Sequence, residues 1–355
     1  MIHVGSPAFE AGEEMAQRAQ EILRRARERE HERWPAAFHY YSDYQLEMAA
    51  ENTAMHLEFI TAAVWAGEQI LFDDYLKWCK VRFRGLGMSF DMLTGSQEEI
   101  RDAIVDTVQP ATARLASNTV NEALAKFPSF TDVVETSIDP GGTLAGPALA
   151  YSKAVLAGNR PTASKIVMDA LESGVPVGDI YCYFFERTQN ELGRMWQSNV
   201  ITVAQEHIAT EITRAVMAQI YPYISTAEKG SRTVVVAAVG RENHGIAARI
   251  VADAFEMARW QTINVGANTP VGTLIETVLQ ADATVLALSA AMANHVPDVG
   301  EAIRLLRDDP RTAHVCVLVG GYPFNLAPEL WRTVGADGTA ATAREGVAVA
   351  AQLCA

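Results

Sequence analysis

The chain has 355 residues, of which 49% are hydrophobic and 20% are charged. At about 150 residues per domain, this length predicts two or three domains, and the composition excludes wholesale disorder. A formal net charge of −14 argues against nucleic acid as a direct partner, because phosphate binding depends on clustered Lys and Arg. No apolar run reaches the ~20 residues that span a bilayer, and no signal-peptide pattern opens the chain. We therefore expect a cytoplasmic protein without a membrane partner.

Residues 1–140 are predicted to form an all-α domain, with a globin-like fold as one option. A charged stretch at 11–30 has few apolar anchors, and we expect it to lie on a surface or on a partner. Aromatic residues at helical spacing follow from Phe38 to about Phe130. The segment 127–142 carries two prolines and a glycine pair, which predicts the domain boundary.

Residues 143–226 contain four helical stretches with little strand character, separated by short breaks such as Gly158–Pro161 and Gly174–Pro176. Short connections between helices favour antiparallel neighbours, so this region predicts a four-helix bundle. The segment 225–232 is polar and is interpreted as a linker.

Residues 231–355 alternate between short apolar runs and helical stretches. The runs at 233–239, 283–289 and 314–321 are apolar almost throughout, as in strands that are buried on both faces. This alternation predicts a flavodoxin-like, Rossmann-type parallel sheet wrapped by helices.

Three loops of this last domain are predicted to meet at one edge of the sheet. They begin at Arg241, Ser289 and Gly320, directly after the first, third and fourth expected strands, and ligands bind at that edge in open α/β sheets. His244 suits a metal as a neutral imidazole, with Glu242 holding its second nitrogen. Because one histidine cannot enclose a metal alone, we expect a macrocycle to supply the other ligands and an organic tail to enter between the small residues.

These residues resemble the cobalamin-binding domain, whose pattern is Asp-or-Glu-x-His-x-x-Gly, then Ser-x-(Leu or Thr), then Gly-Gly. Ala247 and Ala291 depart from that pattern. The resemblance implies that His244 is the lower axial ligand of cobalt and that the displaced nucleotide tail enters the sheet. It implies cobalamin contacts at Glu242, Asn243, His244, Gly245, Ser289, Ala291, Gly320, Gly321 and Tyr322.

In the bundle, Trp196 is followed after nine residues by Glu206 and His207. This element resembles that of light-sensing adenosylcobalamin proteins related to MerR-type repressors, and a bundle of this size commonly caps the corrin in such proteins. The resemblance implies that Trp196 covers the adenosyl group and that Glu206 meets its ribose. Gln197 stands where those repressors commonly have histidine, which leaves the upper cobalt ligand after photolysis open.

The N-terminal region resembles the helical domain of the photocobilins, which holds a linear tetrapyrrole such as biliverdin. Tyr75, Trp78 and Arg82 fall at i, i+3 and i+7 and so share one helix face. For each single residue, burial in the helical core is at least as good an interpretation. The resemblance implies bilin contacts at His56, Tyr75, Trp78, Arg82 and Arg84.

The main hypothesis is therefore a non-enzymatic photoreceptor that binds adenosylcobalamin and biliverdin. We expect it to signal through a change of conformation or of homo-oligomeric state, and a separate effector protein is one option for its partner. The rival is a corrinoid carrier for a methyltransferase or mutase system, which would use His244 in the same way. A cobalamin-dependent anti-repressor or scaffold is a third reading. We rank the rival lower because no segment is long enough for a substrate barrel of ~250 residues.

Overall fold

A computed structural model describes residues 5–224 and 228–354, so residues 225–227 of the expected linker lie outside the described residues. The chain forms two compact units. One contains the chain up to Asp132 together with Ala290–Arg304 and Tyr322–Ala336. The other contains Val133–Ser289, Leu305–Gly321 and the chain from Asp337.

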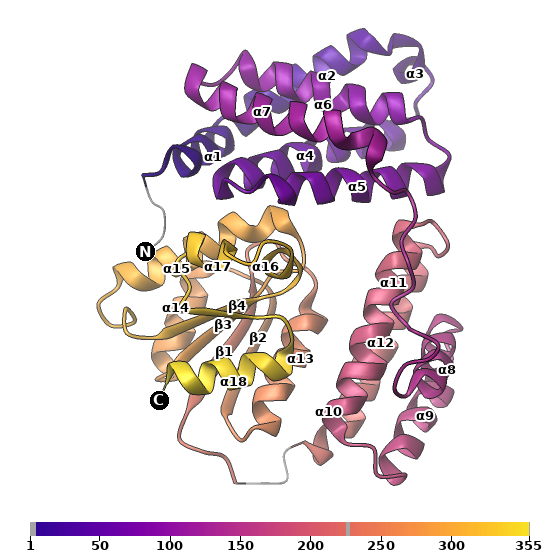
Figure 1. Cartoon of the computed structure of the whole chain (residues 1–355), viewed down its shortest axis with the longest axis vertical. Coiled ribbons are helices and arrows are strands. Elements are labelled where there is room, and N and C mark those ends of the chain that lie inside the picture. The colour runs from indigo at the N-terminus through magenta and orange to yellow at the C-terminus, as the bar shows by residue number, and fades with distance from the viewer. Residues whose placement is uncertain (1–4, 225–227, 355) are drawn as a thin grey trace. The chain divides into compact units, whose positions relative to one another are not determined.

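The N-terminal part of the first unit is helical, as the sequence predicts (Figure 1). Its helices are α1 (Pro7–Gln17), α2 (Ala19–Arg33), α3 (Pro35–His39), α4 (Asp43–Ala66), α5 (Gln69–Leu86), α6 (Phe90–Val105) and α7 (Pro110–Lys126), followed by the 3-10 turn η1 (Phe127–Ser129). No finding bears on the globin-like option.

The charged stretch at 11–30 forms two helices where one was expected. It forms α1 and α2, which are separated at Arg18, and α1 packs on α4 while α2 packs on α6. The break lets each half direct its few apolar residues inward, and Met15 and Ile22 are fully buried. A small number of anchors therefore suffices to hold a highly charged stretch against the other helices, while charged side chains such as Arg24 and Glu28 stay exposed.

Trp65, at the end of α4, joins the N-terminal helices to a segment more than two hundred residues later in the chain. A Cβ placed on Gly12 or on Gly300 would come within 2.4 Å of a Trp65 atom, so both glycines are needed for this approach. Gly300 belongs to α15 (Val296–Asp308), which follows the 3-10 turn η4 (Ala293–His295). The same unit contains α16 (Tyr322–Leu326) and α17 (Leu330–Thr333).

The four predicted helical stretches of the second unit are present. They form α8 (Ala145–Leu156), α9 (Arg160–Glu172), α10 (Val177–Ile180), the π-helix η2 (Tyr181–Glu186), α11 (Arg187–Gln197) and α12 (Val203–Ile220), and the 3-10 turn η3 (Tyr221–Tyr223) follows. The third stretch is therefore interrupted by a π-helical turn. Tyr151, Phe184 and Phe185 lie fully buried between the helices.

The predicted parallel sheet is also present, with strand order β2-β1-β3-β4-β5. Its strands are β1 (Thr233–Val239), β2 (Gln261–Thr269), β3 (Val285–Ser289), β4 (Cys316–Gly320) and β5 (Gly338–Ala340). The sequence analysis missed β5, because three residues are too few to show a strand pattern. Helices α13 (Gly245–Met257) and α18 (Ala343–Leu353) pack on one face of the sheet, and α14 (Val271–Gln280) packs on β1 and β2 (Figure 1).

Every residue of β1 is buried, as expected for a central strand that is covered on both faces. Within the described ranges, no helix is both long enough and apolar enough to cross a membrane.

The contact between Trp65 and Gly300 predicts a steric effect of a single methyl group. Gly300→Ala should lower the free energy of unfolding by about 1–3 kcal/mol, because the new Cβ overpacks against the indole. The matched control is Gly193→Ala in α11, where a Cβ meets nothing within 4 Å and helix propensity should raise stability by about 0.5–1 kcal/mol. Chemical denaturation followed by circular dichroism measures both, and equal stability of the two variants would contradict the packing account.

Candidate functional site

The loop after β1 brings a buried carboxylate to an exposed imidazole. Glu242 is 1% exposed, and its Oε1 accepts a hydrogen bond of 3.0 Å from the backbone N–H of His244. The same oxygen is hydrogen-bonded to Nδ1 of the His244 ring. The loop is fixed to the end of β2, where the backbone N–H of Asn268 donates to the carbonyl of Glu242 at 2.8 Å.

Glu242 orients the ring of His244 and raises its pKa. Its hydrogen bond raises the pKa of His244 above the usual value, burial opposes that shift, and the negative charges of Glu242 and Glu206 add to it. The bond at Nδ1 leaves Nε2 as the nitrogen that a metal would take. The imidazole side chain is 58% exposed, so a large ligand can reach it.

The second part of the expected site lies at the ends of β3 and β4. Ser289 and Gly320 are paired in register across these strands. A Cβ on Gly320 would lie 3.1 Å from the carbonyl oxygen of Ala340 in β5, and Gly321 has a φ of +108° that side chains rarely allow. Small residues are thus required here by the close packing of β4 on β5 and by the backbone conformation of Gly321.

The donor set of this loop fits a corrinoid. One exposed, oriented imidazole supplies a single axial ligand, as a macrocycle that already occupies the equatorial positions of its metal requires. Seven of the expected cobalamin contacts belong to the second unit: Glu242, Asn243, His244, Gly245, Ser289, Gly320 and Gly321. Within the loop, the backbone N–H of Gly245 donates to the Asn243 carbonyl at 2.8 Å.

The three cobalamin contacts predicted in the bundle, Glu206, His207 and Trp196, differ from one another in burial and in their partners. Glu206, in the first turn of α12, accepts from the Thr210 hydroxyl at 2.8 Å and is close enough to act on the His244 pKa. His207 is exposed, with Nε2 3.6 Å from Glu206. Trp196 is partly buried and packs against the apolar core of the bundle.

Sequence reasoning missed two arginines beside this loop. Arg214 and Arg249 line a cavity of about 180 Å³ together with Gly245, Asn264, Gly266 and Ala267. The Arg249 guanidinium is paired with Asp253 at 2.8 Å, and Arg214 pairs with Glu211 at 3.5 Å. The spacing of Glu206, Thr210 and Arg214 at i, i+4 and i+8 could have shown that Arg214 shares the helix face of Glu206.

Two further expected cobalamin contacts, Ala291 and Tyr322, belong to the first unit. The Tyr322 hydroxyl donates to Oδ1 of Asp74 in α5 at 3.0 Å. Nearby in the chain, the Asn294 amide donates to Oε2 of Glu58 in α4 at 3.0 Å. The segments that follow β3 and β4 are therefore tied to the N-terminal helices.

The expected bilin contacts are largely occupied by one another or by the protein. Nδ1 of His56 and the Tyr75 hydroxyl share a hydrogen bond of 2.8 Å, and Tyr75 stacks on Phe59 and Trp78. Burial lowers the pKa of His56 to about 4 and lowers that of Arg82. Arg84 is ion-paired with Asp132 at 2.5 Å. His56 and Tyr75 thus form part of a closed core, which gives no support for a bilin site.

Comparison with known proteins identifies both halves of the second unit. Residues 232–348 match a family described as a B12 binding domain, and residues 149–221 match a second family with the same description. The monomethylamine corrinoid protein of Methanosarcina barkeri has a similar fold, with a TM-score of 0.53, 19% identity, and coverage of 59% of this chain and 100% of that one.

The curated relatives are methylamine corrinoid proteins. Dimethylamine corrinoid protein 3 of Methanosarcina mazei is 30% identical over 34% of this chain and 72% of its own length. Dimethylamine corrinoid protein 1 of Methanosarcina acetivorans is 25% identical over 47% of this chain and 78% of its own. For dimethylamine corrinoid protein 3 of M. acetivorans, 31% identical, the match spans 36% of this chain and only 59% of the relative.

The chain belongs to the corrinoid-protein family built on the B12 binding domain. The cofactor class predicted from His244 is thereby confirmed as a corrinoid. The prediction of a light sensor with a biliverdin chromophore is wrong, since the relatives are corrinoid proteins of methylamine systems. The His244 loop is common to sensors and carriers and could not separate them.

The hydrogen bond between Glu242 and His244 predicts a titration that depends on one carboxylate. In the protein without corrinoid, the pKa of His244 should lie above the ordinary histidine value of about 6.5. The pairing with Glu242 therefore stabilises the folded state fully below the unfolded-state pKa of His244. This stabilisation is lost as the pH rises through the folded-state pKa. Glu242→Gln should lower the pKa of His244 clearly, and Glu206→Gln should lower it less. Histidine NMR measures these values, and an unchanged pKa in Glu242→Gln would refute the assigned bond.

Proposed function

We propose that this chain is the corrinoid carrier of a methyltransferase system. The observation that carries the proposal is the exposed His244 ring, fixed through Nδ1 by buried Glu242 at the end of β1. The relatives named dimethylamine corrinoid proteins support the methyltransferase side of the carrier hypothesis over the mutase side. A carrier needs no substrate barrel within the described residues, because the catalytic barrel can belong to a separate partner protein.

The residues of this loop hold and orient the cofactor. His244 would hold the cobalt of a bound corrinoid through Nε2, and Glu242 would keep Nδ1 protonated and the ring in one orientation. The bound corrinoid supplies a cobalt centre that accepts a methyl group and passes it on. Ser289 and the Gly320–Gly321 pair receive the nucleotide tail between the ends of β3 and β4. The protein acts as a carrier, and the methyl transfers are catalysed by its partners.

The bundle is proposed to cover the opposite face of the corrin, with Trp196 and Glu206 towards its upper ligand. A carrier must expose that ligand to its partners, so this cover has to move away during each transfer. Methylated amines are the proposed methyl donors, by analogy with the relatives' names. The adenosyl form of the cofactor, expected from the spacing of Trp196 and Glu206, is the alternative to a small upper ligand.

Replacing the proposed axial ligand tests the site. His244→Ala should give the spectrum of a corrinoid without an imidazole ligand and weaken cobalamin affinity by about 10–100-fold. His207→Ala is the matched control, because His207 is an exposed histidine of the bundle, and it should retain the wild-type spectrum. Absorption titration measures both, and a wild-type spectrum in His244→Ala would remove His244 from the site.

Carriage of a methyl group tests the function. Cobalamin-loaded protein, reduced and treated with ¹⁴C-iodomethane, should retain the label through gel filtration and release it to a thiolate acceptor in the dark. The same protein offered adenosylcobalamin and methylcobalamin should bind the methyl form at least as tightly. Protein that binds cobalamin but neither retains nor releases the label, or that binds only the adenosyl form, would refute the carrier assignment.

A further inference from the structure

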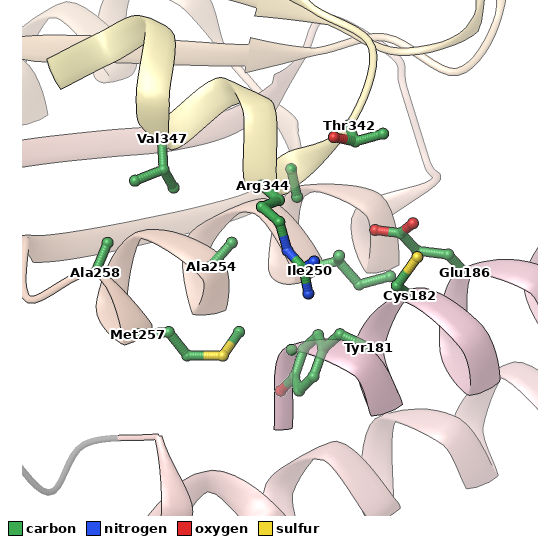
Figure 2. Close-up of a pocket in the computed structure, with 12 residues that line it drawn as sticks. Tyr181, Cys182, Glu186, Ile250, Ala254, Met257, Ala258, Thr342, Arg344 and Val347 are labelled. Atoms are coloured by element: carbon green, nitrogen blue, oxygen red, sulfur yellow. The ribbon is translucent and has the colours of Figure 1, made fainter. Parts of the chain in front are cut away.

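A second cavity lies in the second unit, away from the loop of His244. It has a volume of about 430 Å³ and is formed by η2, α13 and α18, as Figure 2 shows. Ile250, Ala254 and Met257 of α13 and Val347 of α18 make its walls mostly apolar. Sites for small organic molecules commonly have volumes of about 300–1,000 Å³ and apolar walls with a few polar groups.

The π-helical turn directs polar side chains into this cavity. Tyr181 and Glu186 are the ends of η2, and the wider turn of a π-helix brings residues five apart, together with Cys182, onto one side. All three line the cavity in Figure 2. The Tyr181 hydroxyl donates to Oδ2 of Asp253 at 2.6 Å, and Asp253 also accepts from Arg249. This wall is therefore fixed before any ligand arrives.

The carboxylate of Glu186 is free to accept hydrogen bonds from a ligand. Within the described residues no side chain or backbone group forms a hydrogen bond with its carboxylate, and burial raises its pKa to about 6. Arg344, which also lines the cavity, already donates to Oδ1 of Asp179 at 2.8 Å. The charge of Arg344 still acts on Glu186 and opposes that shift of its pKa, and Glu186, Arg344 and Asp179 together carry a formal net charge of −1 at neutral pH. A partly buried carboxylate without a hydrogen bond is costly, and a cationic donor would relieve that cost.

We propose that this cavity binds a small organic ammonium ion, with its charged nitrogen at the Glu186 carboxylate and its apolar body against Ile250, Met257 and Val347. An organic anion would meet Glu186 with the wrong charge, and Arg344 is already paired with Asp179. The site shares no residue with the proposed corrinoid site, so it stands independently of the carrier function.

The test uses the full chain and three probes of equal length: hexylammonium, hexanol and hexanoate. Isothermal titration should show hexylammonium binding tightest, and the ¹³C-methyl signal of Met257 should shift on its addition. Glu186→Gln should weaken hexylammonium at least tenfold and bring it level with hexanol, because a charge-assisted hydrogen bond is lost. Glu172→Gln, an exposed carboxylate on α9, should bind as the wild type does.

A second variant separates the cavity from surface charge. Ala254→Leu fills the space between α13 and α18, so it should abolish the Met257 shift while circular dichroism stays unchanged. Three results would each overturn the proposal: hexanol or hexanoate binding as tightly as hexylammonium, unchanged hexylammonium affinity in Glu186→Gln, or binding without a Met257 shift. If Ala254→Leu does not fold, the comparison of Glu186→Gln with Glu172→Gln decides alone.

Discussion

The hydrogen bond between Glu242 and the His244 ring is the interaction on which the proposed function depends. Glu242 is buried at the end of the central strand and bonds both the backbone N–H and the ring of His244. Without this carboxylate the imidazole would be free to turn and to present either nitrogen. Rigid placement by a buried partner converts an ordinary loop histidine into a directed metal ligand. The parallel sheet brings Ser289 and Gly320, at the ends of β3 and β4, to the same edge as this bond.

Carriers and light sensors share this arrangement, which explains why the loop alone misled the functional assignment. The choice of a sensor depended on Trp196, Glu206 and a diffuse aromatic pattern in the N-terminal helices. In the structure His56 and Tyr75 bond each other in a closed core, as aromatic and histidine residues at helical spacing commonly do. The relatives then favour the carrier, for which a single chain needs no catalytic domain of its own.

The fold was largely predictable from sequence where the apolar pattern is long and regular. Strand β1, with seven consecutive buried residues, and the helices of the bundle were predicted, and so was the pairing of Glu242 with His244. Strand β5 was too short to predict. The packing of Gly300 on Trp65 and the bonds from Asn294 and Tyr322 to α4 and α5 join residues far apart in sequence, and no local pattern encodes such contacts. The π-helical turn at Tyr181–Glu186 was hidden for a similar reason, since its residues read as ordinary helix.

The most direct test of the central claim is the electron paramagnetic resonance spectrum of the protein loaded with cob(II)alamin. The account predicts that the cobalt lines are split by the nitrogen of His244, so that labelling the protein with ¹⁵N-histidine changes each triplet splitting into a doublet. Triplets that persist in the ¹⁵N-histidine protein would show that the axial nitrogen belongs to the cofactor's own base. That result would contradict the assignment of His244 as the ligand that holds the corrinoid.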